Sequence, residues 1–289
     1  MTRSMAKTKL DTRSIGLDVG LSFSKWLTGK ENLHYGDWTG LEVTAANVGP
    51  AQVAYTDRLF TYLPDTPCRI LDIGGGAGET ARKLIERGHE VEIVIPSPFL
   101  AQRCRENAPQ AKVHETGFEG FTSETRFDIC LFSESFQYIP LDTGLSKAQG
   151  LLAPGGRIVL ADCFRSEGYR RDRVRATVGG GHPIEAFRQT VSDLDLEVLG
   201  EIDITEAVAP SVDVEQGLYN ILGHAITRVD DELQEKRPRS RWALNRLVRL
   251  FLNDRRRARL HQRLMEQTRT SAVFSANNTY LMMALRPRG

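Results

Sequence analysis

The sequence predicts an α/β protein with a doubly wound, mostly parallel sheet of seven strands. Between residues 69 and 161, short apolar runs alternate with segments of helical periodicity, and the connections between them are brief. Strands that are joined by helices in this way run parallel to each other. A glycine cluster directly follows the first apolar run, at the place where parallel sheets of this kind bind ligands.

The seven expected strands are short runs of mainly β-branched and other apolar residues. The run at 127–132 is apolar almost throughout, which is typical of a strand that is buried on both faces. The expected strands are 70–73, 91–95, 112–114, 127–132, 157–161, 196–203 and 279–285. Apolar residues at helical spacing, with Gly88 and Pro109 as stop signals, predict helices around 81–85 and at 99–107, 145–152 and 183–194.

The rest of the chain divides into parts of different character. We expect residues 1–14 to be a disordered leader, since they are polar and basic and lack the apolar centre of a signal peptide. Residues 15–62 form a helical region that covers the ligand site. Residues 63–207 and 276–289 form the α/β domain, and 208–275 form a helical, basic cap, because an insertion of this length near a sheet's edge is usually a lid.

Composition narrows the class of protein. The chain has 289 residues and a formal net charge of +1, so its overall charge indicates no particular partner. No apolar run approaches the about 20 residues that cross a bilayer. The cysteines and histidines lack metal-ligand spacing, so we expect no metal site, buried free thiols and a reducing, cytoplasmic location. They are Cys68, Cys104, Cys130, Cys163, His34, His89, His114, His182, His224 and His261.

The sequence of the glycine loop does not match the motifs of two common nucleotide-binding sites. Its residues run from Asp72 to Gly78 and read D-x-G-x-G-x-G. The dinucleotide fingerprint, G-x-G-x-x-G, needs a further glycine three positions after Gly76, and Glu79 stands there. No Gly-Lys-Ser/Thr follows, so the phosphate-loop signature fails as well.

The loop resembles motif I of the class I S-adenosylmethionine (SAM) methyltransferases, and further segments extend the resemblance. One of them, LHYGDW, is similar to the "HyGyW" element of the subgroup that includes tocopherol, sterol and glycine-betaine-type methyltransferases. Another, ESFQYI, is similar to the "ES-x-x-H" segment of that subgroup. The segments are LHYGDW at 33–38, FDICLFSES at 127–135, ESFQYI at 134–139, PGGRIVL at 154–160 and NNTYLMMAL at 277–285. The resemblance covers about residues 33 to 165 and the last strand.

The resemblance implies a role for each matching residue, with SAM as the cofactor. The loop glycines would pack against the methionine half of SAM, and the acid before them would orient the loop. An aromatic residue of the N-terminal element would reach the amino-acid end of SAM, and two residues after the fourth strand would lie near the sulfonium. These residues are, in that order, Gly74, Gly76, Gly78, Asp72, Tyr35, Ser133 and Glu134.

Two positions depart from the family pattern. The acid that usually binds the ribose hydroxyls is Ile95 here, and the acid that often contacts the adenine is Phe118. Phe118 could sandwich the adenine opposite Pro96, and Ser97 or Glu119 could replace the lost ribose contact. Losing a charge-assisted hydrogen bond costs about 1.5–3 kcal/mol, which weakens SAM binding roughly ten- to a hundredfold without abolishing it.

Methyl transfer from a sulfonium is a direct in-line displacement, so the enzyme mainly positions the reactants and needs no nucleophilic triad. The candidate catalytic residues are Glu134, Gln137, Tyr138 and His34. Glutamine stands at the family's histidine position and cannot act as a base. This substitution favours positioning by Gln137, or a base from the cap.

Within the cap, residues 236–263 carry a local concentration of basic residues, and Asp254 is the only acid among them. The basic residues are Lys236, Arg237, Arg239, Arg241, Arg246, Arg249, Arg255, Arg256, Arg257, Arg259 and Arg263. Three interpretations compete: a solvated helical face, a docking site for an acidic carrier protein or a phosphorylated substrate, and a helix lying on anionic lipid. In the lipid interpretation, Trp242, Phe251 and Leu252 lie opposite the arginines. Nucleic acid is not expected, since no recognition module is present.

The sequence therefore predicts a SAM-dependent methyltransferase that acts on a small-molecule or lipid-like biosynthetic intermediate, which a carrier protein could present. Because Ile95 and Phe118 replace the acidic cofactor contacts, two alternatives stay open. One is a related enzyme that uses SAM or another ligand for a different reaction, such as cyclisation. The other is a non-catalytic relative of the same fold.

Overall fold

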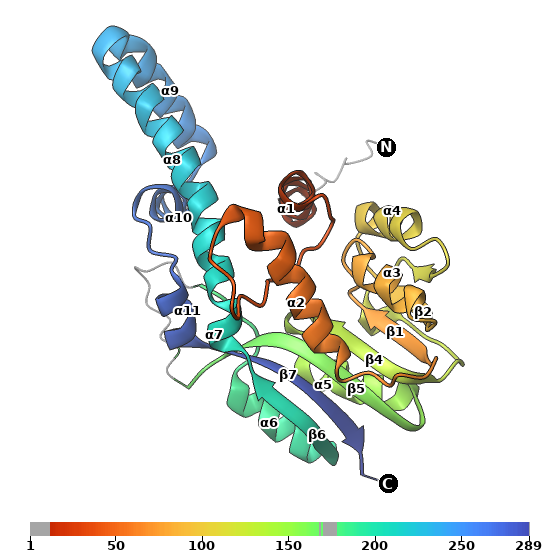
Figure 1. Cartoon of the computed structure of the whole chain (residues 1–289). Coiled ribbons are helices and arrows are strands. Elements are labelled where there is room, and N and C mark those ends of the chain that lie inside the picture. Colours follow the sequence, from red (N-terminus) through yellow and green to blue (C-terminus); the bar gives the residue numbers. More distant parts are fainter. Residues whose placement is uncertain (1–11, 168, 170–177, 289) are drawn as a thin grey trace, which may run out of the picture.

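The computed structural model describes residues 12–167, 169 and 178–288. Its sheet has seven strands in the order β3-β2-β1-β4-β5-β7-β6, and β7 runs antiparallel to both of its neighbours (Figure 1). The strands are β1 Arg69–Ile73, β2 Glu90–Val94, β3 Lys112–His114, β4 Phe127–Ser133, β5 Leu152–Arg165, β6 Leu196–Asp203 and β7 Asn278–Pro287. The predicted fold class is confirmed.

Eleven helices are assigned within the described residues. They are α1 Thr12–Thr28, α2 Val48–Phe60, α3 Glu79–Glu86, α4 Pro98–Asn107, α5 Leu141–Leu151, α6 Ile184–Asp193, α7 Thr205–Val208, α8 Pro210–Lys236, α9 Pro238–Phe251, α10 Asp254–Met265 and α11 Ser271–Asn277. Short 3₁₀ turns lie at Ala45–Asn47, Phe118–Gly120 and Phe136–Tyr138. Because α1 begins at Thr12, the last three residues of the predicted leader are helical, and residues 1–11 lie outside the described residues.

Alternating side chains of the central strands build two apolar layers, since successive residues of a strand point to opposite faces. Ile70, Ile93 and Met282 lie in the layer beneath α1 to α4 and the start of the cap. Leu71 and Val94, each adjacent in sequence to one of these, lie in the layer beneath α5 and α6. These nearly fully buried positions explain why the central strands read as continuous apolar runs.

The carboxyl ends of the parallel strands meet at one edge of the sheet. Ile73 at the end of β1 pairs with Val94 of β2 and with Phe132 of β4. The Gly74 N–H continues the ladder by donating to the Val94 carbonyl at 2.7 Å. The glycine loop therefore leaves the sheet where the sequence places it, between the ends of three strands.

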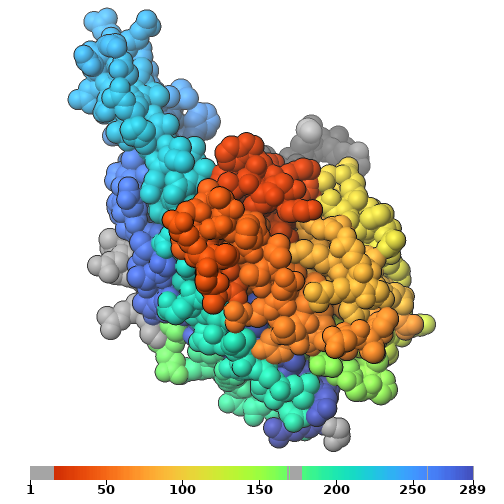
Figure 2. Space-filling model, viewed as in Figure 1, coloured from red at the N-terminus to blue at the C-terminus, as the bar shows by residue number. Residues whose placement is uncertain are grey.

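Helices α8 and α9 form a hairpin that projects away from the rest of the molecule (Figures 1 and 2). Prolines stand at the start of both helices, where a missing backbone N–H costs nothing. The expected position of Trp242 is wrong: it lies beside Arg246, whose guanidinium is 5.4 Å from its ring, and not opposite the arginines. At about 100° per residue, Trp242 stands roughly 40° from Arg246 and roughly 140° from Leu247 around the helix.

Two further findings bear on the environment of the chain. All four cysteines are free thiols, and three of them are buried, as expected; the cytoplasmic location stays a prediction. Within the described part of the chain, no helix has both the length and the apolarity that crossing a bilayer requires.

Candidate active site

The glycine loop combines close packing with one open direction. Gly74, Gly76 and Gly78 have φ values of 79°, 56° and 88°, which side chains rarely allow. A Cβ on Gly74 would lie 2.4 Å from the Ser135 Cβ, and one on Gly78 would lie 2.9 Å from the Cys104 Cα. A Cβ on Gly76 would have only a methyl carbon of Leu33 near it, at 4.0 Å. The loop is therefore packed at both ends and open in the middle.

Asp72 lies beneath this loop at the end of β1. It is 1% exposed, and its Oδ2 has no hydrogen-bond partner among the described residues. Burial raises the pKa of Asp72 to about 7. Oδ2 lies where it would be 2.6 Å from a Cβ on Gly75, so only a glycine fits above it. The loop thus holds a buried acid with unused hydrogen-bonding capacity.

The segment between α1 and α2 is fastened across the loop through Glu31. The Glu31 carboxylate accepts hydrogen bonds from Arg103 of α4, at 2.6 and 2.8 Å, and from Asn107 at 2.8 Å. Its backbone N–H donates to Glu79 of α3 at 3.3 Å. Burial opposes ionisation, but the hydrogen bonds from Arg103, Lys25 and Asn107 lower the pKa of Glu31 to about 2. This anchor was not identified from the sequence.

Glu134 follows β4 and receives two hydrogen bonds on one oxygen. Its Oε1 accepts the Tyr35 N–H at 2.7 Å and the Tyr280 hydroxyl at 2.8 Å. The Tyr280 proton is used in this bond, so the Tyr55 hydroxyl, 2.7 Å away, donates to Tyr280. Glu134 has a φ of 56°, which is strained for a residue with a side chain. The backbone is therefore bent so that this carboxylate meets both tyrosines.

Burial raises the pKa of Glu134 to about 8, although its two donors act in the opposite direction. A second acid, Asp162 of β5, lies in the same region and is fully buried. Asp162 accepts the backbone N–H groups of Gln137, at 3.1 Å, and Cys163, at 2.7 Å. Burial raises the pKa of Asp162 to about 7. Two acids that change charge near neutral pH thus lie level with each other, one in β5 and one directly after β4.

His34 and Tyr35 lie close to this network in different roles. The His34 ring stacks on Tyr55 at 4.6 Å and 18°, and its Nδ1 donates to the Tyr35 carbonyl at 2.7 Å. Burial lowers the pKa of His34 to about 4, so the imidazole is neutral. The Tyr35 ring packs edge-on against Phe274 at 5.9 Å. Its backbone rather than its hydroxyl reaches the expected catalytic carboxylate.

The residues that the sequence predicts at the ribose and the adenine do not converge as closely as the residues around Glu134. Ile95 is buried in the core, and its N–H donates to the His114 carbonyl at 3.0 Å. Ser97 caps α4, since its hydroxyl accepts the Leu100 N–H at 3.3 Å. Pro96 is exposed. Ile95 supplies no carboxylate at the end of β2, and compensation by Ser97 stays a prediction.

Phe118 is buried in the layer beneath α5, where its ring meets Phe132 edge-on at 5.8 Å. The Lys147 ammonium lies 5.5 Å from the same ring and donates to the Glu119 carbonyl at 2.8 Å. The adenine sandwich and a ribose contact by Glu119 stay predictions. Tyr138 is exposed, and Ser133 is partly buried beside Ala161 of β5.

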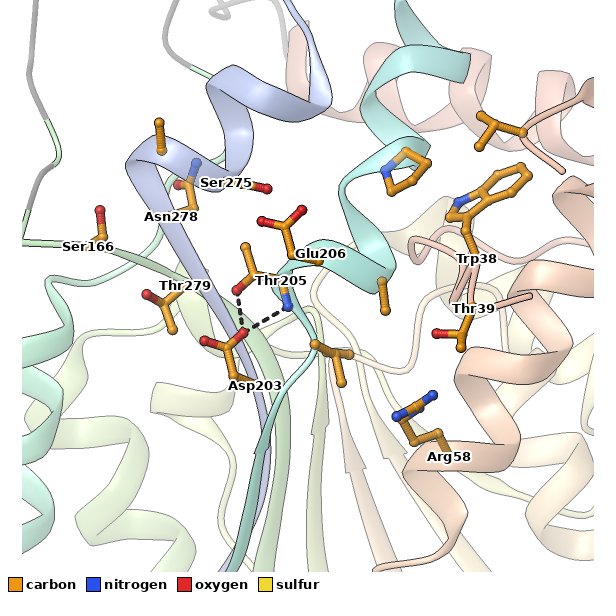
Figure 3. A pocket seen from close by; sticks show the side chains of 15 residues that line it. Trp38, Thr39, Arg58, Ser166, Asp203, Thr205, Glu206, Ser275, Asn278 and Thr279 are labelled. Carbon is orange, nitrogen blue, oxygen red and sulfur yellow. Dashed lines mark hydrogen bonds between the residues drawn. The ribbon is translucent and has the colours of Figure 1, made fainter. Parts of the chain in front are cut away.

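A cavity of about 830 Å³ opens at the same edge of the sheet, beyond β5 and β6 (Figure 3). Asp203 and Thr205 lie on its floor, where the Thr205 N–H and hydroxyl both donate to the Asp203 carboxylate. Trp38 lies on one side and Asn278 on the other. The glycine loop does not line this cavity. Thr205 Oγ1 accepts the Tyr280 N–H at 2.7 Å, so the floor contacts the residue that binds Glu134.

Besides Glu31, three residues around Glu134 were missed by sequence reasoning. Asp162 had a usable signal, because an acid inside the apolar run of a buried strand is unusual unless it has a role. Tyr55 and Tyr280 had none, since aromatic residues in a helix and in a strand are ordinary core residues. Only their convergence on Glu134 identifies them.

Part of the chain is similar in sequence to known methyltransferases. Residues 70–156 match the model of a family described as a methyltransferase domain. An uncharacterized methyltransferase of Geobacillus kaustophilus is 29% identical over 156 residues, which are 51% of this chain and 70% of that protein.

Two solved structures share the fold over most of their length. The cyclopropane synthase MmaA2 of Mycobacterium tuberculosis has a TM-score of 0.65 at 16% identity, covering 93% of this chain and 95% of that one. The geranyl diphosphate C-methyltransferase of Streptomyces coelicolor, solved with geranyl-S-thiolodiphosphate and S-adenosyl-L-homocysteine, has a TM-score of 0.59 at 14% identity. This match covers 92% of the present chain and 91% of that protein.

Proposed function

The chain carries a class I methyltransferase domain, and from this premise we propose that it transfers a methyl group from SAM to a small-molecule or lipid-like acceptor. The observation that carries the proposal is the open face of the loop at Gly76, next to the buried and partly unpaired carboxylate of Asp72. A ligand can approach bare main chain there, and the acid can take up a positively charged group.

The residues present fit the methionine half of SAM. The main chain of the glycine loop would hold that half, with Asp72 beneath it and Tyr35 at its end. When bound, SAM supplies an electrophilic methyl group. The ribose end has no acid at Ile95, so we expect binding that is weaker than the family norm by roughly ten- to a hundredfold.

In this proposal Glu134 accepts the proton that the acceptor loses. A carboxylate with a pKa of about 8 is a stronger base than an ordinary glutamate. The Tyr280 hydroxyl stabilises the ionised form, and the Tyr55 hydroxyl fixes the orientation of Tyr280. Gln137 is held in place through its backbone N–H by Asp162, which suits the positioning role expected for it.

The cavity of Figure 3 is the proposed entry for the acceptor. Its floor contacts Tyr280 through Thr205. Ser166, Glu206 and Thr279 are among its polar lining residues. Trp38 and Val43 supply apolar wall. Polar side chains beside an apolar wall suit a molecule with a polar group and a hydrocarbon body.

A non-methylating use of SAM, such as cyclisation, is the second candidate, and the buried Ile95 in place of the ribose acid favours it. The mass of the product separates the two functions, because methyl transfer adds one CH₂ unit for each event. Protein that binds neither SAM nor S-adenosylhomocysteine on titration would indicate the third possibility, a non-catalytic relative.

Calorimetric titration with S-adenosylhomocysteine tests the loop. Gly76→Ala should weaken binding more than tenfold, because its methyl group enters the open space. Gly155→Ala is the matched control: Gly155 has a φ of 79°, and nothing lies within 4 Å of its Cβ position. Both variants carry the same backbone strain, about 1–2 kcal/mol. Unchanged affinity in Gly76→Ala would exclude this loop as the binding site.

Transfer itself can be followed with methyl-labelled SAM and a small-molecule extract of the source organism. We expect label in a product whose mass rises by one CH₂. The rate should rise with pH up to about 8, as Glu134 ionises. Glu134→Gln should abolish transfer while leaving S-adenosylhomocysteine affinity within about twofold. Full activity in this variant would eliminate Glu134 as the base.

A further inference from the structure

The hairpin of α8 and α9 has two different faces. The helices are joined by Arg241, whose guanidinium donates to both oxygens of Asp230 at 2.7 and 2.8 Å. On one side of this junction, Trp242, Arg246 and Arg249 surround a groove of about 470 Å³ together with Gln234 of α8. We call this side the basic face.

The opposite side, which we call the apolar face, presents apolar side chains at its centre. Six large side chains on it have between 47% and 75% of their surface exposed. They are Leu222, Ile226 and Val229 of α8 and Leu244, Leu247 and Phe251 of α9. On both helices the spacing alternates between three and four residues, which is the pattern of helices that pack side by side in bundles. Each helix therefore carries a stripe of exposed apolar side chains that no helix or strand of the described residues covers.

We propose that the apolar face binds a second copy of this chain, hairpin against hairpin, in a two-fold symmetric dimer. A monomer rarely exposes a contiguous apolar patch of more than a few hundred Å². A two-fold axis brings the same patch of two copies together, so a self-complementary apolar surface is sufficient. The inference rests on the hairpin alone and is independent of the proposed function.

The size of the face is compatible with such a dimer. Helix α9 has 14 residues and is therefore about 21 Å long, and two adjacent helices are roughly 20 Å wide. Covering this face on both copies removes on the order of 1,000 Å² of accessible surface, which is the lower end for a specific interface. We therefore expect a dimer that dissociates on dilution.

The charges that border the apolar face on the α8 edge give it little attraction of its own for anionic lipid. Along the α8 edge, Glu232 pairs with Lys236 at 2.5 Å and with Arg228 at 3.6 Å, so these charges largely cancel. Arg246 and Arg249 belong to the basic face. Arginines on the side opposite an apolar face also occur in helices that lie on membranes, so binding to anionic vesicles is the alternative that the experiment separates from dimerisation. The chain's own residues 1–11 contain too few apolar side chains to cover the face.

Sedimentation equilibrium of the full chain over the micromolar range tests the inference. The wild type should move from monomer to dimer as concentration rises. Leu247→Glu, on the apolar face, should weaken dimerisation at least tenfold. Leu250→Glu is the matched control, because Leu250 is 77% exposed on the same helix but lines the groove of the basic face. It should dimerise like the wild type.

Circular dichroism should show equal helix content in both variants, so that loss of dimer cannot be attributed to unfolding. A wild type that remains monomeric at the highest concentration would overturn the inference. Equal loss of dimer in Leu247→Glu and Leu250→Glu would overturn it too. Binding of monomers to phosphatidylglycerol vesicles that Leu247→Glu removes would assign the face to a membrane instead.

Discussion

Replacing Asp72 by asparagine should make the protein more stable at alkaline pH than the wild type. The substitution keeps the shape of the side chain and removes its charge. In the folded protein, burial raises the pKa of Asp72 from 3.8 to about 7. In the unfolded chain the carboxyl ionises at its ordinary pKa of about 3.9.

The sign and size of the effect follow from this difference. The raised pKa gives a contribution to stability that is complete below about pH 4 and is lost as pH rises through about 7. A shift of about three units corresponds to about 4 kcal/mol, since one unit is about 1.4 kcal/mol. Between about pH 5 and pH 8 the variant should gain on the wild type by roughly 2–3 kcal/mol.

Urea unfolding of the ligand-free protein at about pH 5 and about pH 8 measures this change. Comparing the variant with the wild type at each pH cancels effects of the substitution that do not depend on pH. Asp65→Asn on the surface serves as the control and should differ from the wild type by less than about 0.5 kcal/mol at both pH values. If Asp72→Asn differed from the wild type equally at both pH values, the pKa of Asp72 would be the same in the folded and unfolded chains, and burial would not raise it.

Two further substitutions test the contacts around the site. Tyr280→Phe leaves Glu134 with one hydrogen-bond donor and the Tyr55 hydroxyl without its acceptor. The free energy of unfolding should therefore fall by about 1–3 kcal/mol. A variant that is as stable as the wild type in urea would contradict this network. Glu31→Gln weakens the bond to Arg103 and should cost up to about 3 kcal/mol at pH 7 and almost nothing near pH 2. The lowered pKa of Glu31 stabilises the fold above about pH 4.5 and loses that effect as pH falls toward about 2. A cost that is equal at both pH values would refute the assignment.

Local patterns in the sequence were sufficient for the architecture and for part of the site. The period of two in the strands, the period near 3.6 in the helices and the glycines between them are properties of neighbouring residues. Glu134 was also predictable, since it directly follows a strand whose end had to lie at the ligand-binding edge.

The helical phase of α9 marks the limit of such patterns. Trp242, Phe251 and Leu252 are all large and apolar, and the sequence suggested one shared face for them. In the structure Trp242 packs with Arg246, while Phe251 is exposed on the apolar face. The apolar character of Trp242 does not show which face of α9 it occupies, because an indole ring is stable both against an arginine and in an apolar stripe.

By itself, the sequence determined the order of strands and helices along the chain, the glycine loop and the positions of Asp72 and Glu134, because each depends on residues close together in the chain. The tertiary structure alone decided which residues meet at Glu134. Tyr280 lies 146 residues away from Glu134, and Tyr55 lies 225 residues away from Tyr280. Such contacts depend on how the sheet and its covering helices are arranged in space, and no local pattern of residues encodes that arrangement.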